Sequence, residues 1–426
     1  MSDTECAAPS AVQAEPRLSR PFIATLMLAN FGTNVALIAP IQNILPRMIE
    51  SSVGPGDKAI GLGLVTGLGA LAALVFNPVA GHYSDRWVSA DNRTLLIIIG
   101  LVTGAAAHAV LGLQHSLAGI AVWWTICQAT INIAYAPMSA IVVDHVPRRS
   151  WGLVWGLISV AQAVGLVVGL AAVVLVFPSV TAGMTAIAVG YGVCLVPLVW
   201  VLYRLPRVSY QQPAGGPGRP GGRPDLRALL AVGGGFGLVF AGKFLIMLAE
   251  TIALLYLYYY LQDVVHYSDP GDGQLILILI ATVAAIIATV AVGRVADASG
   301  GYRRYAVLSS ALMAATGFLL AGYAAWALVI ACAFTLGAGY GAFQSVSQAL
   351  TLVVLPSPAN AGRDLGIINI ASAVPQVIGA PVAGLVVAGT GGYRGLFVFA
   401  GLLAVAAALA FARVPSQPAP ADPAPA

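Results

Sequence analysis

Residues 58–86 have the sequence KAIGLGLVTGLGALAALVFNPVAGHYSDR, in which a long apolar run ends in a short polar segment. A helix of about twenty apolar residues crosses a hydrocarbon core of roughly 30 Å. Inside lipid, the backbone must be satisfied within helices or closed barrels, and barrel strands alternate polar and apolar residues. This run does not alternate, so it predicts a transmembrane helix.

Runs of this kind recur along the whole sequence. Hydrophobic residues make up 59% of the chain and charged residues 8%, whereas a soluble domain carries about 25% charged residues. The sequence therefore predicts an all-α membrane protein. Its twelve expected transmembrane helices lie near residues 22–48, 58–82, 94–114, 117–143, 152–177, 182–203, 235–262, 272–296, 304–323, 325–354, 364–388 and 394–412.

The composition between these runs predicts five regions. They are an N-terminal tail (1–20), a six-helix bundle (21–204), a Gly/Pro/Arg-rich linker (205–227), a second six-helix bundle (228–413) and a disordered Pro/Ala-rich tail (414–426). With twelve spans, most of the 20 Lys and Arg residues fall on one side. Because basic loops stay in the cytoplasm, we expect both termini to be cytoplasmic and the protein to be a multi-pass protein of the cell inner membrane.

Two blocks of sequence occur once in each half. Gly81 and Asp85 follow the second run, and Gly293 and Asp297 follow the eighth. Before the fifth run the second block holds Arg149, Gly152, Gln162 and Gly165, and before the eleventh it holds Arg363, Gly366, Gln376 and Gly379. Two separate blocks with matching offsets indicate an internal repeat, and hence two pseudo-symmetric six-helix bundles.

The Gly-x-x-x-Asp-Arg block at Gly81, Asp85 and Arg86 resembles the signature of the major facilitator superfamily. Arg93 is similar to the basic residues that follow that signature, and Arg303 and Arg304 follow its second copy. The resemblance implies that these loops latch the two halves in one gating state. The gating candidates are Gly81, Asp85, Arg86, Arg93, Arg149, Gly293, Asp297, Arg303 and Arg363.

A narrower resemblance points to the glycoside–pentoside–hexuronide branch, which mostly imports sugars together with a cation. It rests on Asp144-His-Val-Pro147, on Tyr256-Leu-Tyr-Tyr-Tyr-Leu-Gln-Asp263 and on Gly362-Arg-Asp-Leu-Gly366. Ser347 stands where that branch leads us to expect an acidic residue. Drug-efflux antiporters are the alternative branch, since Gly156, Gly165 and Gly169 match their fifth-span spacing, although Leu170 replaces the expected proline.

Polar side chains at helical spacing lie in the first, fourth and tenth runs. A polar side chain in lipid is costly unless it faces a cavity or a partner. The resemblance implies that the first, fourth, seventh and tenth helices line a central cavity. The candidate substrate-binding residues are Asn30, Thr33, Asn34, Gln128, Asn132, Tyr135, Tyr340, Gln344 and Gln348.

Charged residues within the apolar runs are candidates for ion coupling. Lys243 and Glu250 are seven positions apart, on one face of the seventh helix and about 10 Å apart along its axis. Asp144 lies at the end of the fourth helix. A carboxylate that alternates between wet and dry surroundings can carry a proton, and Glu250 is the sharpest candidate because it is expected near mid-membrane.

These features favour a monomeric secondary transporter, not an enzyme, that moves a small organic solute with H⁺ or Na⁺. The resemblance favours uptake of a sugar- or glycoside-like solute, and proton-coupled efflux of a drug or metabolite is the alternative. A receptor or scaffold that does not transport remains a third hypothesis. The scattered His and the four Cys residues predict no metal site, cofactor or catalytic cluster, and we expect no nucleic-acid partner.

Overall fold

The computed structural model describes residues 19–86, 90–146, 150–204, 235–354 and 361–415. These residues contain twelve helical segments long and apolar enough to cross a membrane. The predicted linker 205–227, the start of the second bundle and most of both predicted tails lie outside the described residues. The elements are α1 (Arg20–Ala39), η1 (Pro40–Ile44), α2 (Leu45–Val53), α3 (Lys58–Arg86), α4 (Ala90–Leu111), α5 (Leu117–His145), α6 (Trp151–Ala171), η3 (Ala172–Val176), α7 (Val180–Arg204), α9 (Gly235–Leu255), α10 (Leu257–Asp263), α11 (Pro270–Ser299), α12 (Tyr302–Gly322), α13 (Trp326–Val353), α14 (Ala361–Thr390) and α15 (Tyr393–Ala412).

The helices form two bundles with the same internal packing. In the N-terminal bundle the contacting pairs are α1 with α6 and α7, α3 with α5, and α4 with α5 and α7. The C-terminal bundle repeats the pattern: α9 contacts α14 and α15, α11 contacts α13, and α12 contacts α13 and α15. Each half thus has six helices in equivalent places, which confirms the predicted pair of pseudo-symmetric bundles.

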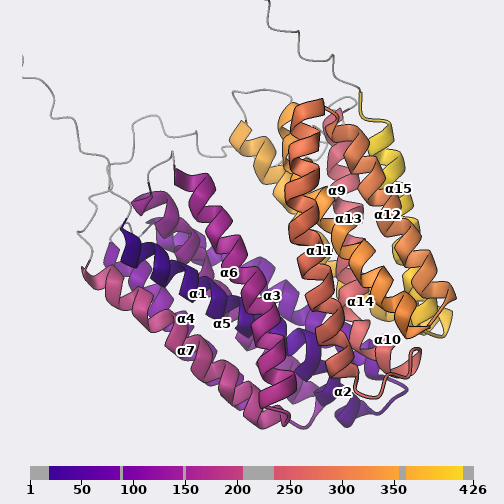
Figure 1. Ribbon diagram of the computed structural model, residues 1–426. Helices are drawn as coiled ribbons and strands as arrows, with labels where there is room; N and C mark the ends of the chain where they lie inside the picture. Colours follow the sequence, from indigo (N-terminus) through magenta and orange to yellow (C-terminus); the bar gives the residue numbers. More distant parts are fainter. Residues whose placement is uncertain (1–18, 87–89, 147–149, 205–234, 355–360, 416–426) are drawn as a thin grey trace, which may run out of the picture.

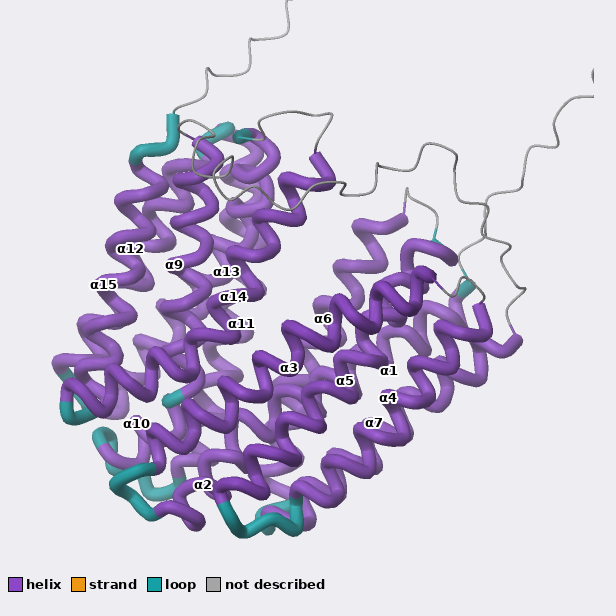
Figure 2. Tube along the Cα trace, turned by 180° about the vertical axis from the view of Figure 1, so that it is seen from behind, coloured by secondary structure: helices purple, strands orange, loops and turns teal. Residues whose placement is uncertain are grey.

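The two bundles meet at one end of the molecule and diverge toward the other. Figures 1 and 2 show them in contact around α2 and α10, while the ends of α6 and α11 nearest the chain termini stand apart. We call the closed side the Lys58 end, after the first residue of α3. The opposite side is the Arg20 end, where α1 begins and α15 stops. Between bundles, α3 packs against α14, and α6 against α11.

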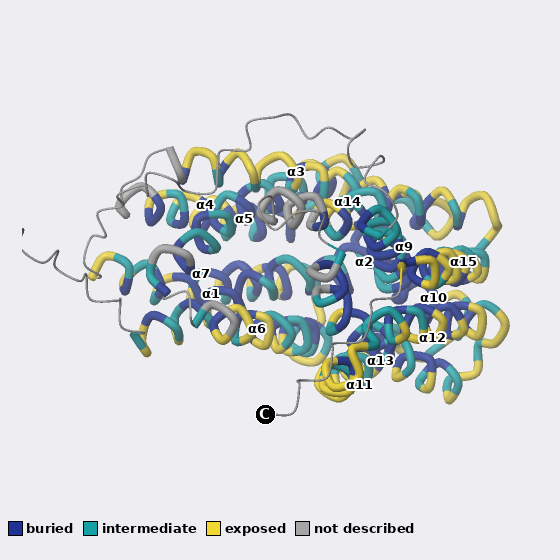
Figure 3. The backbone as a smooth tube through the Cα atoms, turned by 90° about the horizontal axis from the view of Figure 1, so that it is seen from above, coloured by how far each residue is buried: buried dark blue, intermediate teal, exposed yellow. Residues whose placement is uncertain are grey.

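Burial follows this arrangement. Exposed positions run along the outer faces of both bundles (Figure 3). Many exposed side chains are large and apolar, such as Leu385 with an exposed fraction of 72%. One core cluster contains residues of both bundles, including Leu62, Tyr259 and Ala380. A second cluster contains only residues of the C-terminal bundle, such as Val239 and Phe343. Apolar contact between the bundles is therefore concentrated toward the Lys58 end.

Two helices depart from the sequence prediction at the Lys58 end. The first continues to Val53 through a wide turn, in which the Leu45 amide donates to the Pro40 carbonyl; Pro40 lacks an amide hydrogen and disturbs the regular ladder. The prediction of one helix over 235–262 is wrong, because the helix breaks at Tyr256 (φ −102°, ψ 9°) and restarts as α10. Residues 256–261 are tyrosines and leucines, and they include no Gly or Pro that would predict this break.

Candidate functional site

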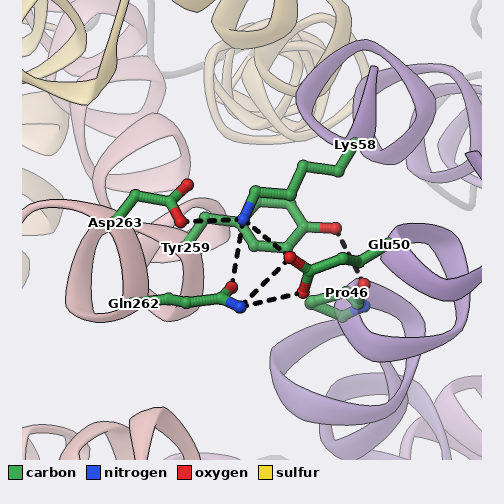
Figure 4. A network of polar contacts seen from close by, with 6 residues as sticks. All are labelled: Pro46, Glu50, Lys58, Tyr259, Gln262 and Asp263. Atoms are coloured by element: carbon green, nitrogen blue, oxygen red, sulfur yellow. Dashed lines mark hydrogen bonds and ion pairs between the residues drawn. The ribbon is translucent and has the colours of Figure 1, made fainter. Parts of the chain in front are cut away.

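A charged cluster closes the Lys58 end between the two bundles. The Lys58 ammonium donates to Glu50 Oε1 (3.0 Å), Asp263 Oδ1 (2.9 Å) and Gln262 Oε1 (3.1 Å), as Figure 4 shows. Gln262 Nε2 in turn donates to both Glu50 oxygens at 3.1 Å. Lys58 is only 3% exposed, and its three ammonium hydrogens match its three acceptors. We name Glu50, Lys58, Gln262 and Asp263 the Lys58 cluster.

Tyrosines of the broken seventh helix surround this cluster. The Tyr259 ring lies under the Lys58 ammonium, 4.7 Å from nitrogen to ring centroid, and its hydroxyl donates to the Pro46 carbonyl at 2.8 Å. The Tyr256 hydroxyl donates to the Ala59 carbonyl at 2.8 Å. Two buried hydroxyls of the C-terminal bundle are thus bonded to the backbone of the N-terminal bundle. The change of direction at Tyr256 positions both rings.

A second polar contact joins the bundles nearby. The amide of Gln274 on α11 donates to Gln42 Oε1 at 2.8 Å, and both residues are buried. The wide turn after Pro40 carries Gln42. Asp269 caps the start of α11 by accepting from the amides of Gly271 (2.8 Å) and Asp272 (3.2 Å). This cap fixes the first turn of α11, and hence the position of Gln274.

Glycines of α3 lie where the two bundles are in close contact. A Cβ at Gly63 would lie 2.8 Å from the Ala380 carbonyl oxygen of α14, and one at Gly67 would lie 3.2 Å from the Pro381 ring. A Cβ at Gly81, near the Arg20 end of the same helix, would meet nothing within 4 Å. The glycines at the Lys58 end permit a backbone approach that Gly81 does not make in this structure.

The N-terminal candidate residues form a hydrogen-bonded group across three helices. Asn30 donates to the Leu26 carbonyl at 2.9 Å, and its oxygen lies 3.4 Å from Gln162 Nε2. Gln162 of α6 also donates to the Tyr135 hydroxyl at 3.1 Å. Thr33 is buried and donates to its own helix at Ala29. The structure therefore brings Asn30 and Tyr135 together through Gln162, which was predicted only as part of the internal repeat.

The other N-terminal candidates lie on α1 and α5. Asn132 accepts from Asn77 of α3 at 3.0 Å and donates to the Gln128 carbonyl at 2.8 Å. Gln128 and Asn132 are both buried. The side-chain oxygen of Asn34 is buried without a hydrogen-bond partner. Asn77 was not predicted as a site residue, because an isolated polar residue in an apolar run gives no periodic signal.

The C-terminal candidates occupy α9 and α13. Glu250 of α9 and Tyr340 of α13 are both half-buried. Gln344, one turn further along α13, is exposed. Lys243 is 3% exposed, and its amine makes no hydrogen bond or ion pair with the residues that the structure describes. The side chain of Gln348 lies outside the described residues.

The predicted gating residues that the structure describes lie toward the Arg20 end. Asp297 accepts from the Tyr302 hydroxyl at 2.8 Å, and Arg303 donates to the Val414 carbonyl at 2.8 Å. A Cβ at Gly293 would be 3.7 Å from that of Ser345. Arg93 is buried and has an interaction partner. The described bonds of Asp297 and Arg303 stay within the C-terminal bundle. Arg149 and the side chains of Asp85, Arg86, Asp144 and Arg363 lie outside the described residues.

Comparisons with known proteins agree with this architecture. The crystal structure of the nucleoside transporter NupG superposes with a TM-score of 0.68 at 15% identity, over 92% of this chain and 98% of that one. A variant of the peptide transporter POT in complex with sulfate gives a TM-score of 0.70 at 12% identity, over 94% and 96% of the two chains. At these identities the likeness shows the fold alone.

Sequence comparison places the chain in a family. An uncharacterized MFS-type transporter of Methanocaldococcus jannaschii is 30% identical over 108 residues, which span 25% of this chain and 26% of that relative. The sequence pattern of the Major Facilitator Superfamily matches residues 21–308 and 239–426. The family match extends over nearly the whole chain and includes both six-helix bundles, so this protein belongs to the Major Facilitator Superfamily of membrane transporters.

Proposed function

We propose that this protein is a proton-coupled carrier that takes up a small, hydrogen-bonding organic solute, such as a sugar or glycoside, by alternating access. The observation that supports it most is the contrast between the two ends. Polar and backbone contacts join the bundles at Lys58, Tyr256 and Gln274, while the opposite ends diverge (Figure 2). Such a pair of rigid bundles can rock about a central site. The carrier works as a monomer and needs no cofactor.

The Arg20 end faces the cytoplasm in this proposal. Arg20, Arg204 and Arg413 flank spans at that end, and short cytoplasmic loops are enriched in Lys and Arg. The protein then lies in the cell membrane with both termini inside. With this proposed orientation, the observed arrangement would be inward-facing and the Lys58 cluster would form the outer gate.

The solute binds between the bundles, near mid-membrane. Amides and hydroxyls from the N-terminal bundle and from α13 supply its hydrogen bonds. Bound solute replaces part of the internal bonding between Asn30, Gln162 and Tyr135. It also approaches Gln344, whose exposed amide makes no hydrogen bond within the part of the chain that the structure describes. The full set proposed for binding is Asn30, Thr33, Asn34, Gln128, Asn132, Tyr135, Tyr340, Gln344 and Gln348.

Glu250 carries the coupling proton. A carboxylate binds a proton more tightly when it is removed from water. A carboxylate that is half-buried in one state and fully buried in the other therefore has a different proton affinity in the two states. Only such a difference lets an ion shift the equilibrium between them. Asp144 and Lys243 are the alternative coupling residues.

The predicted latch acts in the other state. Gly81 has open space around it here, and closing the Arg20 end brings the loop that follows it against the C-terminal bundle. The negative charge of Asp85 then favours the positive end of a facing helix. Arg86, Arg93, Arg149, Gly293, Asp297, Arg303 and Arg363 complete the latch.

Uptake into proteoliposomes tests the proposed function. Purified protein is reconstituted, the interior is buffered one pH unit above the exterior, and the membrane potential is clamped with potassium and valinomycin. Labelled sugars, glycosides and nucleosides are offered in turn. We expect at least one to accumulate, and a protonophore to abolish its accumulation. If the solute only equilibrates across the membrane, with or without the pH gradient, coupling to protons is rejected. If the same pH gradient instead drives a preloaded solute out of the vesicles, the protein is an exporter.

A further inference from the structure

Lys243 is a buried cation without a counter-charge. It lies on α9 with 3% of its surface exposed, and it makes no hydrogen bond or ion pair with any residue that the structure describes. Glu250 is seven residues away, about 10 Å along the helix axis, which is too far for an ion pair. A charge inside a membrane protein is costly unless a partner or a water-filled cavity compensates it.

The surroundings of Lys243 are apolar. Val239 and Ile246, one turn on either side of it, belong to the core cluster of the C-terminal bundle. Long cationic side chains lie along apolar surface and keep the charged tip accessible. With 3% of its surface exposed, Lys243 has only slight contact with open space in this structure.

A second unpartnered polar group enters the same cluster from the neighbouring helix. Ser347 of α13 is 1% exposed, and its hydroxyl has no hydrogen-bond partner. Phe343 and Leu350, one turn on either side of Ser347, belong to the cluster that also contains Val239 and Ile246. Helices α9 and α13 are in contact. The helix neighbours of Lys243 and of Ser347 thus belong to one apolar cluster, and neither side chain makes a hydrogen bond with residues that the structure describes.

We propose that Lys243 and Ser347 receive a negatively charged group of the transported solute, so that the substrate is a small organic anion bearing a carboxylate or phosphate. This inference deepens the proposed function and rests on it for the location of the binding site. Ammonium and hydroxyl donors both suit an anionic oxygen, and charge-assisted bonds are the stronger class. Low polarity around the amine strengthens the attraction.

The experiment compares matched neutral and anionic ligands on purified full-length protein in detergent. The pairs are glucose with glucuronate, glucose with glucose 6-phosphate, uridine with uridine 5′-monophosphate, and glycerol with glycerol 3-phosphate; inorganic phosphate is offered alone. Binding is measured as ligand-dependent thermal stabilisation. We expect at least one anionic member to bind about 10- to 100-fold more tightly than its neutral twin, the range expected for one hydrogen bond to a charged group. Comparing the carboxylate ligand with the phosphate ligands identifies which anionic group the site binds.

Variants assign the preference to Lys243. Lys243→Met keeps an apolar stem in the cluster, and it should remove the 10- to 100-fold preference while its unliganded melting temperature reports folding. Lys243→Arg should keep most of the preference, and Arg394→Met, an exposed cation outside the cluster, should change nothing. Equal binding of neutral twins, undiminished anion binding by Lys243→Met, or no binding of any anionic member would overturn the proposal.

This assay uses no ion gradient, so it separates the inference from the proposed coupling. Glu250→Gln should retain the anion preference in detergent. If pH-driven uptake fails while Lys243→Met still loses anion binding, coupling is rejected and the anion site stands. If uptake is pH-driven while the neutral twins bind equally, the anion site is rejected and the coupling stands.

Discussion

Glu250→Gln abolishes pH-driven accumulation and leaves exchange of solute across the membrane measurable. One proton moved with the solute across a gradient of one pH unit supports about tenfold accumulation. We expect that ratio to fall to about 1 in the variant. Glutamine has the shape of a protonated glutamate and cannot release the proton, so the coupled step is lost while the uncoupled movement of the bundles remains.

The physical basis is the position of Glu250. It is half-buried on α9, a helix that packs against α13 and α14. A change in the distance between the bundles changes how much water reaches it, and with that its affinity for a proton.

Asp272→Asn is the matched control for this prediction. Asp272 is an exposed carboxylate in the first turn of α11, so its loss removes the same charge without touching the site. Accumulation should persist in that variant. A wild-type accumulation ratio in Glu250→Gln would make Glu250 structural and move the coupling role to Asp144 or Lys243.

Lys58→Met opens the outer gate. The ammonium holds Glu50 and Asp263 at 3.0 and 2.9 Å, and its removal leaves two carboxylates facing each other. Breaking a fully buried pair costs about 3–5 kcal/mol. Glu50 is 22% exposed and Asp263 is 35% exposed, and solvent screens the repulsion. We therefore expect the closed state to lose about 1–3 kcal/mol, a shift of roughly 5- to 150-fold toward outward-open molecules.

A cysteine at Ala59 reports this shift. Ala59 is 7% exposed beneath the Tyr256 hydroxyl, and a membrane-impermeant maleimide reaches it only when the gate opens. Labelling should be faster in Lys58→Met by about the same factor. Lys58→Arg should stay near the wild-type rate, as should Asp57→Asn, which removes an exposed charge beside the cluster. Equal labelling rates in Lys58→Met and the wild type would show that the cluster does not hold the gate.

The membrane architecture could be predicted from the sequence because it depends on the distribution of apolar residues along the chain. Apolar runs of about twenty residues determine the spans, and the repeat at Gly81 and Gly293 indicates two halves. The structure confirms twelve spanning helices and the same set of helix contacts in each half. No long-range information is needed for either result.

The Lys58 cluster was missed because its members come from opposite halves of the chain. Glu50 lies in α2 and Lys58 begins α3, whereas Gln262 and Asp263 end α10. Each alone has the form of an ordinary charged or polar residue at the edge of a span. Pairing depends on how the bundles dock, which no local pattern encodes. Gln162 and Asn77 were missed because their partners come from other helices of the same bundle, and helix packing is likewise not encoded locally.

The kink at Tyr256 was missed for a different reason. The segment from Tyr256 to Leu261 is entirely apolar or aromatic and contains neither of the residues that usually interrupt a helix. Its backbone turns because Tyr256, Tyr259 and Tyr260 each place a hydroxyl on a distant carbonyl: Ala59, Pro46 and Leu320. Tertiary hydrogen bonds override the local helical preference here.

Paired spin-label distances on the wild-type protein test alternating access most directly. One pair, Ser51→Cys and Asp272→Cys, lies at exposed positions on α2 and α11 at the Lys58 end. The other, Tyr203→Cys and Arg304→Cys, lies at exposed positions on α7 and α12 at the Arg20 end. As solute and pH are varied, the account predicts that one distance lengthens whenever the other shortens. Distances that stay fixed, or that lengthen together, would contradict it.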